Sequence, residues 1–310
     1  MPSSTDLGGP DSSFAKSRWF TRGWTLQELI APREVEFFSK DWDSLGFRSN
    51  LFREILEITR ISYDVLRENG RKALQRKSVA QKMSWASRRE TTHSEDMAYC
   101  LLGLFEVNMA LLYGEGTNAF IRLQNKILKR SNDQSIFAWT APRPQGVSKT
   151  ELSIAGFLAS KPSYFEHSQT YTSCSDPSQH LRLTRPYSMT NMGLCIDIPV
   201  FEVPGKANQF MVVLLCTSIR NKEKNSCIGF PVFVNEPRLF QNHGLVESEH
   251  MSDWCYARRD AYQGPTALKA RSFSIDKIGP YLEIDWDARN RGIKAHVGTL
   301  YVPQGSSTFP

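Results

Sequence analysis

Trp24 and Glu28, near the start of the chain, have types and a spacing that could do chemistry. If residues 23–31 are helical, these side chains lie about one turn apart on the same face. The pair would then hold a carboxylate beside a flat hydrophobic wall. Two interpretations stay open: a solvated glutamate that pairs with Arg22 or Arg33, or a catalytic or ribose-binding carboxylate.

The opposite face of this short helix is apolar and is expected to pack inward. Leu26, Leu29 and Ile30 share that face at helical spacing, whereas Gln27 falls on the outward face. Pro32 is expected to end the helix, because proline lacks a backbone N–H and disfavours helical angles in the residue before it.

The run WTLQELIAP at residues 24–32 follows an Arg-Gly pair and closely resembles the last block of the fungal HET (heterokaryon incompatibility) domain. Three further runs, in the same order, resemble the segment that follows this domain in many such proteins: MSWASRRETT (83–92), EDMAYCLLGLF (95–105) and LLYGEG (111–116). The resemblance is firm over residues 18–139 and extends loosely to the end of the chain.

HET domains are similar to TIR domains, whose active members split NAD between nicotinamide and ribose with a glutamate close to a tryptophan. Carried over to this chain, the resemblance implies that Glu28 is catalytic and that Trp24 and Arg22 bind the substrate. The departing nicotinamide leaves an oxocarbenium-like ribosyl centre, which a fixed carboxylate can stabilise. NAD would then be a substrate, and neither a cofactor nor a metal is implied.

The chain departs from the family pattern at its start. A complete HET domain carries several strands and helices before this block, and a single βαβ unit already needs about 30 residues. We therefore expect an N-terminally truncated domain, with a TIR-like remnant at residues 17–45 behind a disordered leader at residues 1–16, which is poor in apolar side chains. The nucleotide pocket would be incomplete, so activity of this chain alone stays open.

Beyond the remnant, residues 46–140 are expected to be helical. Residues 50–61 and 79–89 carry apolar stripes, a T-x-x-E capping box at 92–95 predicts a third helix, and a fourth is expected to run to about residue 130. Trp42 falls in a predicted turn and is interpreted as a packing anchor. The Gly-Glu-Gly run at 114–116 is interpreted as a tight turn rather than a phosphate loop, because the rest of a phosphate-binding motif is missing.

A Pro-rich linker at residues 141–150 precedes a β-rich region at 151–310. The fold class is therefore α+β, with an antiparallel sandwich or barrel-like C-terminal domain. Strands of the β-rich region are predicted at short apolar runs separated by turns: residues 181–184, 193–198, 210–217, 229–234, 272–275, 281–284 and 297–302. One further strand is predicted near the start of the chain, at residues 34–39.

Composition narrows the class of protein. The net charge of +6 includes a basic stretch from Arg67 to Arg89, but no nucleic-acid motif accompanies it, so we expect no nucleic-acid partner. The 6 cysteines form no Cys-x-x-Cys pair and are expected to be reduced thiols rather than metal ligands. No run is apolar and long enough to span a membrane, and we expect a cytoplasmic protein.

Two functions follow from the resemblance. The first is a fungal incompatibility protein that acts in nonself recognition and cell death, with NAD hydrolysis in the complete domain. The second is a catalytically inactive relative that acts as a protein-interaction module. The expected partners are other HET-type or signalling proteins, or further copies of the chain.

Overall fold

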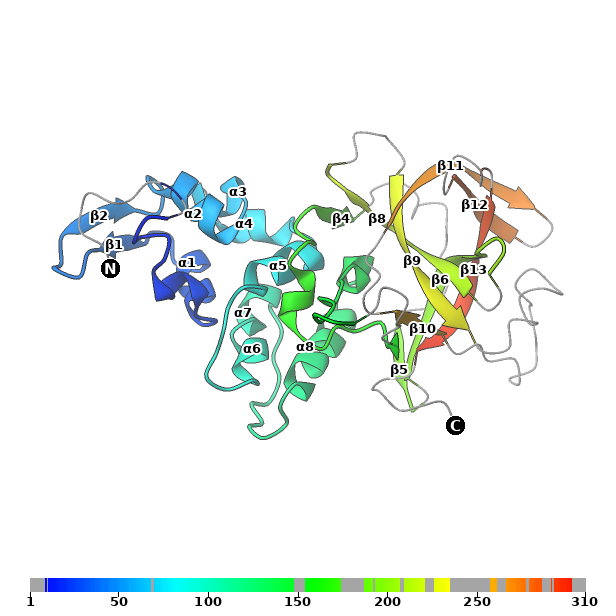
Figure 1. Ribbon diagram of the computed structural model, residues 1–310, viewed down its shortest axis with the longest axis horizontal. Coiled ribbons are helices and arrows are strands. Elements are labelled where there is room, and N and C mark those ends of the chain that lie inside the picture. The colour runs from blue at the N-terminus through cyan, green and yellow to red at the C-terminus, as the bar shows by residue number, and fades with distance from the viewer. Residues whose placement is uncertain are drawn as a thin grey trace. The chain divides into compact units, whose positions relative to one another are not determined.

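The computed structural model describes residues 9, 11–67, 70–147, 154–173, 187–191, 193–206, 209–220, 226–234, 257–260, 266–276, 279–285, 291 and 293–302. The chain divides into two compact units: one contains residues up to Ile127 together with Ser160–Gln169, and the other contains Leu128–Ala159 and residues from Thr170 onward. Helices fill the first unit and antiparallel strands the second, so the α+β fold class is confirmed (Figure 1). The change of unit at residue 128 comes ahead of the linker predicted at 141–150.

The first unit consists of short helices and one hairpin. Its elements are η1 (Arg18–Thr21), α1 (Thr25–Ile30), β1 (Glu36–Phe38), β2 (Ser44–Phe47), α2 (Phe52–Thr59), α3 (Tyr63–Arg67), α4 (Gly70–Gln75), α5 (Val79–Ala86), α6 (Asp96–Tyr99), α7 (Leu102–Phe105), most of α8 (Asn118–Leu128) and η3 (Pro162–Phe165). The helices expected at 50–61 and 79–89 correspond to α2 and α5, and the strand expected at 34–39 corresponds to β1.

Ordered structure begins before the predicted end of the leader. Residues 11–16 form turns, and Phe14 is fully buried, with its ring 5.1 Å from that of Phe20 and 5.5 Å from that of Phe37. A single aromatic side chain thus ties this stretch to the core, although its other residues are polar or small. The rest of the predicted leader, residues 1–8 and 10, lies outside the described residues.

A capping box is present at α5 and not where it was predicted. The Ser78 hydroxyl accepts the N–H of Gln81, and the Gln81 side chain accepts the N–H of Ser78, both at 3.1 Å. The capping box predicted at residues 92–95 is wrong, because α6 begins at Asp96 and the Glu95 carboxylate is bound elsewhere. Ser78 and Gln81, which have the same spacing in the sequence, form the capping box instead.

The second unit is an antiparallel β structure. Its elements are η2 (Gln134–Phe137), β3 (Ile154–Ala155), β4 (Tyr171–Ser173), β5 (Ser188–Thr190), β6 (Gly193–Glu202), β7 (Gln209–Leu214), β8 (Cys216–Ser218), β9 (Ser226–Val234), β10 (Ala257–Asp260), β11 (Thr266–Asp276), β12 (Gly279–Asp285) and β13 (Ile293–Val302). The predicted strands from residue 193 onward are confirmed, except that the one at 210–217 is divided into β7 and β8, which belong to different sheets. The strand predicted at 181–184 lies outside the described residues.

Six of these strands form a continuous circuit of pairings. The order is β11-β12-β13-β6-β7-β9, and β9 also pairs with β11, where Thr266 lies opposite Gly229. A barrel-like arrangement requires pairings that return to the first strand in this way. β6 and β7 are buried along nearly their whole length, on both faces, which explains why most of their residues are apolar, although β6 also contains the buried Asp197.

No helix among the described residues is long and apolar enough to cross a membrane, and no group of three or more His, Cys, Asp or Glu side chains there could hold a metal ion. The cysteines at positions 100, 195, 216 and 227 are buried free thiols, and the other two lie outside the described residues.

The Gly-Glu-Gly run at residues 114–116 binds an anion, but the anion is part of the protein. The Glu95 carboxylate accepts the N–H groups of Gly114 and Gly116 at 2.7 and 3.0 Å. Both glycines have positive φ angles, 101° and 58°, which favour glycine at these positions. Hydrogen bonds from its own N–H and from those of Gly116 and Gly114 lower the pKa of Glu95 to about 2. The run therefore forms a turn around an internal carboxylate.

Replacing Glu95 by Gln should lower the thermal unfolding temperature of the full chain at pH 7, because an amide oxygen accepts these hydrogen bonds more weakly than a carboxylate. The folded-state pKa lies below the ordinary value of 4.5, so the ionised carboxylate stabilises the fold at neutral pH and loses that effect as the pH falls from 4.5 through about 2. The difference between wild type and variant, followed by circular dichroism, should shrink over this range. A difference that stays constant would contradict the assignment.

Candidate functional site

Helix α1 is fixed to the rest of its unit by a close approach of two backbones. The Gly23 N–H donates to the Glu90 carbonyl at 2.8 Å, and the Glu90 N–H donates to the Thr21 carbonyl at 2.7 Å. A Cβ atom at position 23 would lie 2.4 Å from the Thr91 methyl carbon, closer than two carbon atoms can approach. Any larger residue before Trp24 would therefore force the Thr91 side chain to move.

A buried cation holds the same junction. Arg89 is 6% exposed, and its guanidinium donates to the Arg22 carbonyl at 2.7 Å, to the Thr25 hydroxyl at 2.8 Å and to the Trp85 carbonyl at 3.3 Å. Among the described residues it has no carboxylate partner, and burial lowers its pKa to about 10. Arg89 therefore joins the end of α5 to the turn that starts α1.

The faces of α1 are largely as predicted. Leu26 and Leu29 are fully buried, and Ile30 is 6% exposed. Gln27 differs from the prediction, because its amide points inward and donates to the Cys100 carbonyl at 2.6 Å. Glu28 remains on the outward face.

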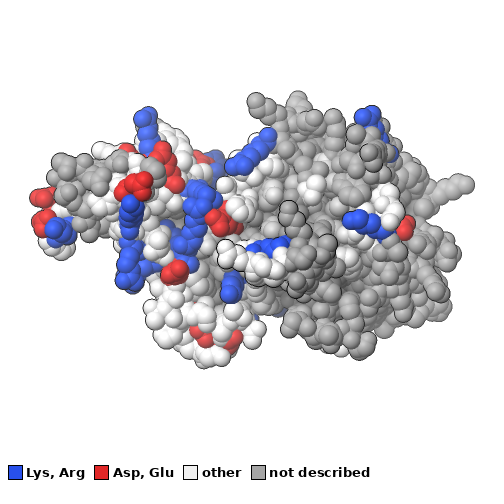
Figure 2. Space-filling model, in the orientation of Figure 1, with Lys and Arg blue, Asp and Glu red and all other residues white. Residues whose placement is uncertain are grey.

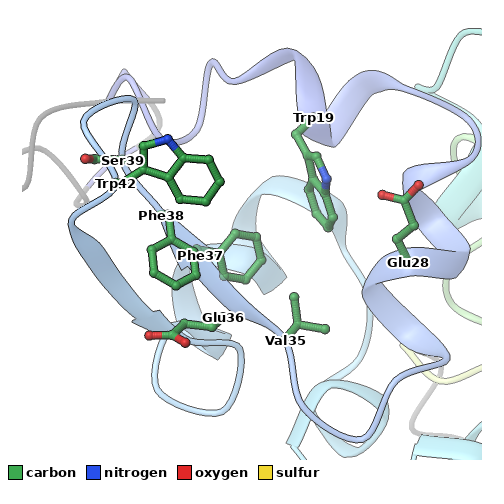
Figure 3. Close-up of a pocket in the computed structure, with 8 residues that line it drawn as sticks. All are labelled: Trp19, Glu28, Val35, Glu36, Phe37, Phe38, Ser39 and Trp42. Carbon is green, nitrogen blue, oxygen red and sulfur yellow. The ribbon is translucent and has the colours of Figure 1, made fainter.

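Glu28 stands at the margin of an open pocket of about 420 Å³ (Figure 3). Trp19 of η1 lies beside it, and the turn between β1 and β2 supplies Trp42. The remaining wall comes from β1 and the residues next to it, and the full lining is Trp19, Glu28, Val35, Glu36, Phe37, Phe38, Ser39 and Trp42. Aromatic rings thus form most of the surface, and the polar ends are two carboxylates and one hydroxyl.

The aromatic rings that line the pocket pack against other aromatic rings. Trp19 packs edge-on against Phe37 at 5.3 Å, and Phe37 is itself buried against Phe14 and Phe20. Across the pocket, Phe38 contacts Trp42 at 5.9 Å. Figure 3 shows the Glu28 carboxylate next to the Trp19 ring, whereas Glu36 lies at the opposite margin, where it accepts the Ser44 hydroxyl at 2.7 Å.

Trp42 is not the packing anchor that its sequence context indicated. Its side chain is 82% exposed, and its φ angle of 67° lies in the left-handed region that tryptophan rarely adopts. The Ser39 hydroxyl holds this turn by accepting the N–H groups of Asp41 and Asp43, both at 3.1 Å. The turn therefore presents a large indole to solvent at the rim of the pocket.

The predicted site residues are not all brought together. Glu28 lines the pocket, whereas Trp24, 40% exposed, and the exposed Arg22 are not among its lining residues. Glu28 forms no ion pair with Arg22 or Arg33 among the described residues, so the surface-pair interpretation is also not what the structure shows. Sequence reasoning missed Trp19 as the neighbour of Glu28, and the only available signal was the density of aromatic residues between positions 14 and 42.

Some of the charged side chains elsewhere on this unit form ion pairs or are buried within the fold. In the basic stretch, Lys77 pairs with Asp64 and Arg88 with Glu166, both at 2.8 Å, and Arg89 is buried. Figure 2 shows Lys and Arg side chains gathered over the helical elements on the viewed face. The pocket differs in charge from this basic surface, because none of the residues that line it is basic.

Comparison with known proteins gives two partial matches. A family model described as a domain of unknown function, DUF8212, matches residues 118–212. Over 132 residues the chain is 46% identical to vegetative incompatibility protein HET-E-1 of Podospora anserina. A stretch of the chain is thus similar to part of a fungal incompatibility protein.

That relationship has a limited extent. It covers 42% of this chain and 10% of HET-E-1, so the chain spans about a tenth of that relative's length. No solved structure matches. The fungal, incompatibility-related part of the predicted resemblance is supported, and the TIR-like remnant and the truncation stay predictions.

Replacing Arg89 by Met should destabilise the chain by about 2–4 kcal/mol, because the carbonyl groups of Arg22 and Trp85 and the Thr25 hydroxyl lose a charged donor. Urea unfolding monitored by tryptophan fluorescence measures this change. Arg88→Met is the matched control, since Arg88 is 54% exposed in its pair with Glu166, and it should cost less than about 1 kcal/mol. Equal effects of the two substitutions would contradict the role assigned to Arg89.

Proposed function

We propose that this chain takes part in fungal heterokaryon incompatibility, in nonself recognition that ends in cell death. The observation that carries the proposal is the 46% identity to HET-E-1 over 132 residues. The proposed partners are other incompatibility-type or signalling proteins, or further copies of the chain, and the proposed compartment is the cytoplasm. The activity of the whole relative is part of the proposal, because the match covers 10% of that protein.

NAD hydrolysis is one biochemical activity by which the chain could act. In its favour, Glu28 carries an exposed carboxylate, without an ion-pair partner among the described residues, beside an indole at an open pocket. A carboxylate so placed can stabilise an oxocarbenium-like ribosyl centre. Against it, NAD carries two phosphates, and no basic side chain lines the pocket to receive them.

The composition of the pocket favours the second activity, an interaction module. Four aromatic rings and two carboxylates line an open hollow, and Trp24 and Arg22, the proposed substrate-binding residues, are absent from that lining. Large exposed aromatic side chains beside polar groups are typical of protein-interaction sites. Our conclusion is that the described residues of this unit bind a partner and that NAD hydrolysis requires groups beyond the pocket lining.

We expect the purified chain to release no nicotinamide from NAD above the level of its Glu28→Gln variant, as measured by liquid chromatography. The reason is the lack of phosphate-binding cations in the pocket. Glu57→Gln, an exposed substitution on α2, is the control for effects of a lost surface charge. Turnover that Glu28→Gln abolishes and Glu57→Gln retains would instead establish hydrolysis by Glu28.

The incompatibility role predicts a cell-level result. When the chain is expressed in one of two otherwise identical fungal strains, fused cells should die more often than fused cells of the parent strains, because the two partners then differ in a recognition protein. Uptake of a vital dye by fused cells measures the difference. Equal viability with the chain expressed at detectable level would contradict the role.

A further inference from the structure

We propose that the pocket around Trp19, Glu28 and Trp42 is a receptor site for an arginine side chain of a partner protein. The inference rests on the interaction-module function proposed above and names the chemistry of the group recognised. It is carried by three independent features of the pocket: its charge, its exposed indole faces and the conformation of Trp42.

The charge of the pocket favours a cation. Its lining contains two carboxylates, Glu28 and Glu36, and no basic side chain, although the chain as a whole carries a net charge of +6. The exposed residues Asp41 and Asp43 flank Trp42 in the turn. A cationic side chain is repelled by the protein as a whole, so its binding requires a local site of this sign.

The Glu28 and Glu36 carboxylates differ in whether they already accept a hydrogen bond within the protein. Glu36 already accepts the Ser44 hydroxyl. Glu28 has no hydrogen-bond or ion-pair partner among the described residues, and its carboxylate lies next to the Trp19 ring (Figure 3). A guanidinium can form two parallel hydrogen bonds to such a carboxylate while its plane rests on an adjacent aromatic face.

The indole faces supply the second part of the site. Trp42 is 82% exposed and Trp19 half-buried, and both line the same hollow, whose floor contains Phe37 and Phe38. Tryptophan gives the strongest cation–π attraction of the aromatic side chains, and arginine is the cation found most often in such contacts.

The conformation of Trp42 points to a use for its exposure. Burial of the ring does not explain the left-handed backbone at this position, because the ring is mostly in solvent. A residue other than glycine in this region is strained, and such strain often occurs at binding sites. The hydrogen bonds to Ser39 hold the backbone of this turn, and the Phe38 ring contacts the indole, with the two ring centroids 5.9 Å apart.

The test uses the full chain and two short peptides in a neutral Gly-Ser sequence, one with a single arginine and one with citrulline, its uncharged isostere, at the same position. Isothermal titration should detect binding of the arginine peptide and at least tenfold weaker binding of the citrulline peptide. Trp42→Gly should weaken arginine binding about 2- to 30-fold through the lost cation–π contact, without loss of stability, because glycine accepts the positive φ. Glu28→Gln should weaken it to a similar degree.

Trp24→Ala is the matched control, because Trp24 is an exposed tryptophan of the same unit that does not line the pocket, and it should leave binding unchanged. Equal affinity for the two peptides, no binding of either, or equal effects of the Trp24 and Trp42 substitutions would overturn the proposal. Its failure is separable from that of the incompatibility role: death of fused cells without arginine binding removes the receptor site alone, whereas Trp42-dependent binding without cell death removes the role alone.

Discussion

The helical unit depends on a buried cation at the start of α1. The Arg89 guanidinium donates three hydrogen bonds to groups on the η1–α1 turn and on α5. Among the described residues, it has no carboxylate partner. A buried charge of this kind is stable only where several oriented acceptors replace water. Because those acceptors include the Arg22 carbonyl and the Thr25 hydroxyl, the cation fixes the start of α1 and, with it, the direction in which Glu28 leaves the surface.

This arrangement accounts for the local sequence around α1. Gly23 permits the backbone contact with Glu90, and Gln27 uses its amide to bind the Cys100 carbonyl. The two positions flank Thr25, which contacts Arg89, so each of these residues serves an internal contact. Glu28 and Trp24 are the side chains of the helix left free to meet solvent, and only Glu28 does so at the pocket.

Local patterns were enough to predict α2, α5 and most of the strands, since apolar periodicity reflects which face is buried. They could not predict the pocket, because its walls come from η1, α1 and a hairpin turn whose backbone geometry depends on hydrogen bonds to Ser39. The burial of Arg89 could not be predicted either, because in a stretch of basic residues it resembles the solvated charges around it. Glu95 was assigned to a helix cap because the sequence gives no sign that two glycines about 20 residues later would bind it.

The second unit shows the same division between local and distant information. Its strands follow from short apolar runs, whereas the pairing of β9 with β11 joins residues far apart in the chain and has no local signature. The sequence therefore predicted an antiparallel β region without predicting the circuit of pairings that β9 and β11 complete.

The central claim is that the pocket beside α1 receives a guanidinium group. The most direct measurement is a titration of the full chain with N-acetylarginine amide, followed by NMR of the tryptophan indole N–H signals. A guanidinium bound in the pocket should cause saturable shifts of the Trp19 and Trp42 signals and leave the signals of Trp24 and of the buried Trp85 and Trp139 unmoved. Uniform small shifts of all these signals, or none, would contradict it.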